Sequence, residues 1–255
     1  MSERFGGREG WAENLKERRG KLDRAAVAER LASGEDFESV SVADLDLSGL
    51  SLEGKSFRMA DVRGLHLFNE ATGETANIKN TDWTDADVAD LGSLADFSSV
   101  EAAGARFGFT EKLKDRKARY EREGKKPDWD DCGGLHNFVG NNGNFPATKW
   151  SNIDFGGRSS YEAVFFDADL MDAEFIGCDL AGMDLSRACL TGVKIIDPES
   201  LLGMQIYEKF VAAVARGVAF SDPVIQANWQ ASILENGEAA AVERFLGINI
   251  VPLEN

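Results

Sequence analysis

The sequence contains few of the residues that catalytic and metal sites use most often. Among its 255 residues are two histidines, three cysteines and five prolines. An odd number of cysteines without a close pairing motif is typical of reduced thiols rather than of a disulfide framework. No apolar run approaches the roughly 18 residues that a membrane-spanning helix requires. We therefore expect no membrane segment, no disulfide and little side-chain chemistry.

Positive charge is also scarce. The chain has 28 lysines and arginines against 44 aspartates and glutamates, a formal net charge of −16. Nucleic-acid phosphates and anionic lipids both attract positive surfaces, so this balance argues against direct binding to either. The opening residues, MSERFGGREGW, lack the apolar core of a secretory signal, so we expect a cytoplasmic protein. The charge permits either a very soluble protein or one whose partner is basic.

What the sequence does contain is a repeat of five residues. A large apolar residue stands at almost every fifth position, and a small or slim residue usually stands two positions before it. Neither a helix nor an ordinary strand explains a period of five. A chain that turns a corner every five residues would point both residues inward. The central residues are Phe37, Val42, Leu47, Leu52, Phe57, Val62, Leu67, Ile78, Trp83, Val88, Phe97, Ala102, Phe107, Phe145, Trp150, Phe155, Phe165, Leu170, Phe175, Leu180, Leu185, Leu190 and Ile195.

This repeat resembles that of the pentapeptide-repeat proteins, whose consensus is A-(D/N)-L-x-x. The segments that carry the resemblance are ADFSS (95–99), ADLMD (168–172), CDLAG (178–182) and ACLTG (188–192). The resemblance implies a mainly β fold, a right-handed quadrilateral β-helix with four pentads in each coil. About six coils at the usual strand spacing of ~4.8 Å would form a rod of roughly 30 Å.

The repeat divides the chain into five expected parts. A helical cap (1–34) precedes a first β-helical part (35–109), an insertion (110–144) interrupts it, and a second β-helical part (145–197) leads to a C-terminal region (198–255). Because the ends of a solenoid expose unpaired strand edges, both terminal regions are expected to cover them. The N-terminal helix is alternatively a partner-binding element, and the C-terminal region alternatively a homodimerisation surface.

Helical patterns occur in both terminal regions. Residues 8–33 have apolar residues at helical spacing, with a break at Gly20. A helix is expected to begin at Pro198, because Leu202, Ile206, Phe210 and Val214 form one stripe. A second is expected to begin at Pro223, after Asp222 as N-cap, with an interruption at Asn236 and Gly237 and a short third helix through Phe245.

The insertion contains the only clearly basic stretch, residues 111–126, which we expect to form a short helix ending near Gly124. A Gly/Asn-rich loop follows. Loops of this length are usually functional or disordered. Two interpretations stand, a structural excursion tethered to the rod and a partner-contacting loop. The candidate partner-binding residues of the insertion are Lys112, Lys114, Arg116, Arg119 and Trp129.

Signals of catalysis are weak. Cys132 and His136 are four residues apart beside Asp130 and Asp131, but structural zinc usually takes four ligands in tighter pairs. No third group is identifiable that would orient His136 as a base for Cys132. We therefore expect no catalytic residue, no metal and no cofactor, and a protein that is not an enzyme.

The position before each central residue is often acidic. Stacked on a regular rod, these carboxylates would form ladders of negative charge, which are candidate partner-binding residues. One interpretation is that Asp serves the turns and solubility. The other comes from the resemblance, because quinolone-resistance and gyrase-inhibitor members imitate duplex DNA toward type II topoisomerases. The candidates are Asp46, Asp61, Asp82, Asp87, Asp96, Asp154, Asp169, Glu174, Asp179 and Asp184.

The sequence thus favours a non-enzymatic scaffold that presents a rigid acidic solenoid to a protein partner. A DNA-mimic regulator of a type II topoisomerase or of another basic DNA-binding protein is the first alternative. A targeting or adaptor module, such as a translocated effector, is the second.

Overall fold

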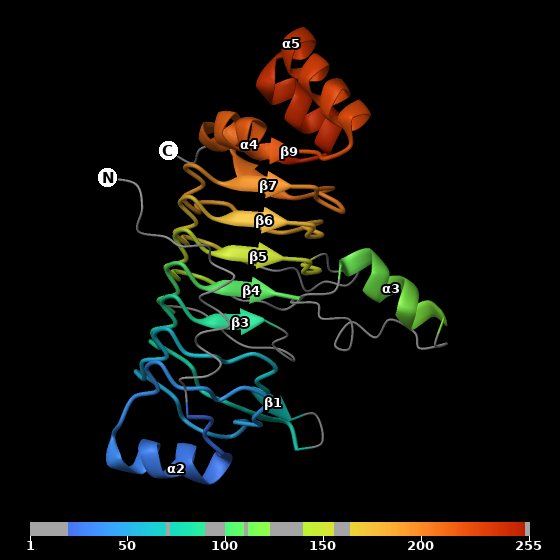
Figure 1. Cartoon of the computed structure of the whole chain (residues 1–255). Coiled ribbons are helices and arrows are strands. Elements are labelled where there is room, and N and C mark those ends of the chain that lie inside the picture. The colour runs from blue at the N-terminus through green and yellow to red at the C-terminus, as the bar shows by residue number, and fades with distance from the viewer. Residues whose placement is uncertain are drawn as a thin grey trace, which may run out of the picture.

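The structure, a computed structural model, describes residues 20–69, 72–89, 100–109, 112–122, 140–155 and 164–252. These residues form a rod of stacked coils with helices at both ends and one further helix, within the insertion, at its side (Figure 1). Asp96, Trp129, Cys132 and His136 lie outside the described residues, as does the first part of the helical pattern in 8–33.

The coils repeat every 20 residues where nothing interrupts them. Ser41 forms a parallel bridge with Asp61, and Asp169 forms one with Cys189. Every described central residue of the pentads is at most 3% exposed, so the predicted inward placement of the central residues is confirmed. The core is therefore one continuous column of apolar side chains along the axis of the rod.

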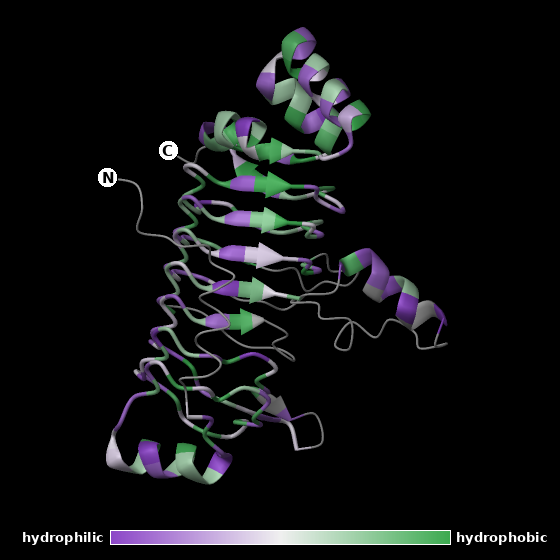
Figure 2. Ribbon diagram, viewed as in Figure 1, coloured by the Kyte–Doolittle hydropathy of each residue, from purple (hydrophilic) through white to green (hydrophobic). Residues whose placement is uncertain are grey.

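One face of the rod forms a six-stranded parallel sheet. Its strands lie in the order β3 (Asp87–Ala89), β4 (Arg106–Gly108), β5 (Lys149–Ser151), β6 (Glu174–Ile176), β7 (Lys194–Ile196) and β9 (Val218–Ala219). In β4 to β7 a polar first residue precedes a buried apolar one, which Figure 2 shows as purple followed by paler or green segments. The protein is a mainly β, right-handed quadrilateral β-helix with helical caps and an inserted excursion, as predicted.

Between Lys21 and Gln205, three coils exceed 20 residues by five or more because each carries additional chain. The strands β1 (Phe68–Asn69) and β2 (Glu74–Thr75) form an antiparallel hairpin in the first such coil. The second contains α3 (Leu113–Arg122), which confirms the short helix predicted in the insertion. In the third, Lys149 pairs with Glu174, 25 residues later. Stacking thus resumes in register after each interruption.

The N-terminal end of the rod is covered by α2 (Arg24–Ser33). Asp23 caps this helix by accepting a hydrogen bond from the Ala26 N–H at 2.8 Å. Val27 is fully buried against the core, and the Arg24 guanidinium donates to the Ser48 carbonyl of the first coils at 3.0 Å. The predicted second helical segment of 8–33 is therefore confirmed, and it packs on the rod.

The helix predicted to begin at Pro198 is wrong, because the coil continues through this region. Gln205 bridges to Asp184 on the preceding coil, and Ile206 is fully buried in the next inward position. Hydrogen bonds to the coil below outweigh the helical spacing of the apolar residues. The segment forms β8 (Gln205–Tyr207), which pairs with β10 (Asn249–Val251), and a short 3₁₀ helix, η1 (Glu208–Phe210), then leads into α4 (Val211–Gly217).

The last helix is α5 (Pro223–Leu246), capped by Asp222 as predicted. Gly237 interrupts it with φ 80° and ψ 164°, which confirms the predicted break. β9 and β10 cover two strand edges at this end of the rod. Of the helices in the described ranges, not one is long and apolar enough to cross a membrane.

Candidate protein-binding surface

The predicted acidic positions are distributed over all four faces of the rod. The face of the six-stranded sheet stacks both signs of charge in one column, which consists of Lys21, Ser41, Asp61, Asp87, Arg106, Lys149, Glu174 and Lys194. A second column consists of Ser56, Asp82, Glu101, Asn144, Asp169 and Cys189. Asp154 and Asp179 stack on a third face, and Asp184 stands on a fourth. The acidic residues therefore form short, mixed stacks.

Most of these carboxylates have a role in the turns. The Oδ1 of Asp169 accepts a hydrogen bond from the Met171 N–H at 2.9 Å, and Asp184 accepts one from the Ser186 N–H at 2.8 Å. Asp82 makes the same contact with Thr84 at 2.9 Å. An Asp side chain that binds backbone two residues later stabilises a turn. This geometry gives the acidic consensus position a structural role at the corners where the contact is made.

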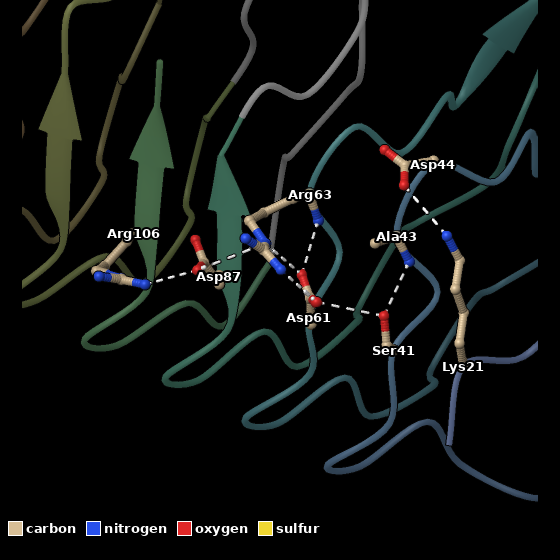
Figure 3. Close-up of polar contacts among 8 residues, drawn as sticks. All are labelled: Lys21, Ser41, Ala43, Asp44, Asp61, Arg63, Asp87 and Arg106. Atoms are coloured by element: carbon tan, nitrogen blue, oxygen red, sulfur yellow. Dashed lines mark hydrogen bonds and ion pairs between the residues drawn. The ribbon is translucent and has the colours of Figure 1, made fainter. Parts of the chain in front are cut away.

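Arginine neutralises the acidic stack on the sheet face (Figure 3). Arg63 donates from Nε and from a terminal nitrogen to the two oxygens of Asp61, both at 2.7 Å. Arg106 donates to Asp87 at 2.6 Å. Burial alone would raise the pKa of Asp61, but the hydrogen bonds and charge of Arg63 outweigh it, so that pKa lies below its ordinary value. The carboxylate is held ionised by its neighbour.

This pairing predicts a pH-dependent effect of Asp61→Asn, which keeps an oxygen for the turn but removes the charge. Because the pKa of Asp61 is lowered by folding, its stabilisation is present above the unfolded pKa of about 4 and is lost as the pH falls through the folded value. Urea unfolding at pH 7 should show D61N less stable than wild type by about 1–2 kcal/mol. The difference should shrink at pH 2–3, and an equal difference at both pH values would contradict the assignment.

The basic helix of the insertion docks on another acidic pair. Lys117 of α3 places its Nζ 2.8 Å from Asp154 and 3.4 Å from Asp179. Leu113, one turn earlier, is 1% exposed. Burial alone would lower the pKa of Lys117, but the bond to Asp154 and the charges of both carboxylates raise it above its ordinary value. The charge of α3 is thus used partly within the molecule.

The other candidates of the insertion are placed differently. Lys112 and Lys114 are exposed, and Arg119 is half-buried. Arg116 belongs to α3, but its side chain is outside the described part of the structure, as is the whole of Trp129. Lys112, just before α3, and Lys114, within it, are therefore exposed cations, as is Arg122 at the end of the helix.

Ion pairs separate the predicted carboxylates into two groups. Seven have a basic partner within 4.0 Å: Asp46 with Arg24, Asp61 with Arg63, Asp82 with Arg58, Asp87 with Arg106, Asp154 and Asp179 with Lys117, and Glu174 with Lys194. Asp169 and Asp184 form no ion pair with any described residue. They stand on adjacent faces, since Asp184 and Cys189 are successive positions of one coil and Asp169 stacks on Cys189.

The basic partners of these carboxylates were not predicted from the sequence. Two of these basic partners could have been found from the sequence, because Arg63 follows Asp61 by two residues and Lys194 follows Glu174 by one 20-residue coil. Arg106 and Lys117 could not have been found in this way, since irregular coils and the insertion lie between them and their partners. Their positions depend on the three-dimensional stacking.

Within the described ranges, no group of three or more His, Cys, Asp or Glu side chains is arranged to hold a metal. Cys178 is 1% exposed, and burial raises its pKa to about 12. A thiol with this pKa is not a nucleophile at neutral pH. Cys178 is a small core residue, as its inward position predicts.

Comparison with known proteins finds the same repeat in part of the chain. Residues 163–196 match the family model described as Pentapeptide repeats, in eight copies. A structure of QnrB1, a plasmid-mediated fluoroquinolone resistance protein, is 14% identical, with 78% of this chain and 87% of that chain covered and a TM-score of 0.34. HetL of the cyanobacterium Nostoc, involved in heterocyst differentiation regulation, is 13% identical, with 73% and 81% covered and a TM-score of 0.32. No curated protein matches. At these identities and TM-scores the neighbours do not indicate what this chain binds.

Proposed function

We propose that this pentapeptide-repeat protein is a non-enzymatic scaffold that binds a basic protein partner. The observation that carries the proposal is the division of the carboxylates. Seven of the predicted residues are neutralised within the fold, whereas Asp169 and Asp184 keep their charge on adjacent faces of a rigid rod. A fixed charge that needs no reorganisation favours both fast encounter and specific docking of an oppositely charged surface.

The surface that carries Asp169 and Asp184 is rigid because of the core beneath it. Leu170 and Leu185, which follow the two aspartates in the chain, are at most 1% exposed. The backbone of Leu170 donates to the Cys189 carbonyl at 3.0 Å, and that of Leu185 donates to the Gln205 carbonyl at 3.1 Å. Each aspartate is thus held between the coil above it and its own turn, so its position is set before a partner arrives.

Affinity capture from the native source tests the proposal. The immobilised chain should retain a protein with a basic surface at about 0.05 M salt and release it near 1 M, because salt screens contacts between exposed charges. Mass spectrometry identifies what is retained. Retention of acidic proteins only, or binding that does not change with salt, would contradict a charge-based partner surface.

A DNA-mimic regulator of a type II topoisomerase is the alternative that the acidic charge and the stacked carboxylates support. Neutralisation by Arg58, Arg63 and Arg106 weakens it, because a mimic of the phosphate backbone requires free negative charge. A gyrase supercoiling assay decides this alternative, and no inhibition or protection at micromolar protein would eliminate it. If capture instead retains components of a secretion or targeting system, the targeting or adaptor alternative applies.

The C-terminal region is the proposed homodimerisation surface. The first half of α5 exposes Val224 at 67% and Leu234 at 86%, and the exposed Ala227 and Ala231 lie between them on the same helical face. An exposed apolar face of this kind is typical of an interaction site, because covering it with a second copy removes its side chains from water. Sedimentation equilibrium of wild type and Leu234→Glu tests the proposal, and two monomeric profiles would reject it.

A further inference from the structure

A groove of about 420 Å³ lies at the C-terminal end of the rod, between β7 and α4. Its volume falls in the usual range for small-molecule sites, roughly 300–1,000 Å³. The lining on the rod side is Thr191, Gly192, Val193 and Lys194, and the lining on the helical side is Lys209, Phe210, Ala212, Ala213, Arg216 and Gly217. Of these residues, only Lys194 takes part in the ion pairs described above, as the partner of Glu174.

Small residues explain why the groove exists. Ala212 and Ala213 face it from the middle of the helical side, between Lys209 and Arg216. At one end the helix touches the coil, because a Cβ on Gly217 would lie 2.2 Å from the Val193 carbonyl oxygen. Close approach at Gly217 and short side chains beside it produce a hollow that is closed at one end.

The charge of the groove is opposite to that of the protein. Its charged lining residues are Lys194, Lys209 and Arg216, and no acidic residue lines it. From residue 198 onward the chain has seven acidic and three basic residues, and two of those three line the groove, the third being Arg244. This concentration of cations in a chain of net charge −16 is a local feature, not a consequence of composition.

Two of these cations are available to a ligand. Lys194 is paired with Glu174 at 2.8 Å, but Lys209 and Arg216 form no ion pair within the described residues. The Lys209 ammonium lies 4.8 Å from the centroid of the Phe210 ring, which is half-buried at the groove. The groove thus offers a guanidinium, an ammonium and an aromatic surface at one place.

We propose that this groove binds a small molecule that carries both a phosphate and a planar aromatic ring, as a nucleotide does. Arg216 matches the geometry of phosphate oxygens, and Lys209 adds a second charge. Phe210 and the two alanines accept the planar group. This site is independent of the carboxylate surface, so a protein partner at Asp169 and Asp184 would not occupy it.

Titration calorimetry at low salt tests the proposal, with AMP as the probe and adenosine and inorganic phosphate as its separate halves. AMP should bind saturably, and each half should bind at least about tenfold more weakly, since each lacks one set of contacts. Arg216→Gln and Lys209→Gln should each weaken AMP binding by about tenfold. Arg244→Gln, the third basic residue of the region, is the matched control and should leave the affinity within about twofold.

Three outcomes would overturn the proposal. They are no saturable AMP binding up to millimolar concentration, equal affinity for AMP and inorganic phosphate, and an equal loss in R216Q and R244Q. Thermal unfolding of each variant checks that it is folded, which is expected because all three side chains are exposed.

Discussion

Gly108→Ala is expected to destabilise the protein by about 3–5 kcal/mol, the largest effect of any single methyl group in the rod. Gly108 ends β4 with φ +130°, a conformation that residues with a side chain rarely adopt. A Cβ there would lie 2.0 Å from the backbone carbonyl oxygen of Ser151 on β5. Backbone atoms in a sheet cannot move aside as a side chain can, so both strands must shift.

Gly54→Ala is the matched control for this prediction. Its φ is +70°, but no heavy atom lies within 4 Å of a Cβ built at this position. It should cost only about 1–2 kcal/mol, the penalty of a left-handed conformation without a clash. Urea unfolding of both variants separates the two contributions. Equal losses in the two variants would show that the close approach of β4 and β5 is unimportant.

Lys117→Met should be the second most damaging change, with a loss of about 2–3 kcal/mol. Removing one partner of a buried ion pair usually costs about 3–5 kcal/mol, and the effect is smaller here because the Lys117 side chain is 36% exposed. Methionine keeps the length of the side chain but leaves Asp154, 2% exposed, and Asp179 without the ammonium that they share.

Hydrogen exchange shows where this loss occurs. A helix of ten residues is marginal in isolation, so α3 depends on its docking, and its amides should exchange faster in K117M. Lys114→Met, on the same helix but exposed, should leave exchange and stability unchanged. Faster exchange in both variants would mean that the positive charge of the helix, not the contact of Lys117, holds α3 in place.

The sequence predicted the fold because the repeat is a local signal. Each pentad specifies its own inward residues, so Phe175 or Leu190 can be assigned to the core without knowledge of its neighbours on other coils. The same holds for the cap at Asp222 and the break at Gly237, which depend on backbone geometry within a few residues. Local rules of this kind need no three-dimensional information.

The charged surface could not be predicted to the same extent. The partner of a carboxylate is set by the residue above or below it, and this depends on how many residues each coil contains. Asp87 stacks on Arg106, which is 19 residues later in the chain, whereas Arg106 stacks on Lys149, which is 43 residues later. The prediction of a helix from Pro198 was wrong for a related reason. Ile206 stacks on the previous coil, although the spacing of the apolar residues around it also resembles that of a helix.

We propose that the unpaired carboxylates, and not the total acidic charge, bind the partner. The most direct measurement is the Kd of the captured partner for two double variants of equal charge, D169N/D184N and D61N/D82N. Asparagine keeps the turn contacts in both. We expect at least a tenfold weakening for the first pair and a change within about twofold for the second. Equal weakening by the two variants, or none by D169N/D184N, would contradict it.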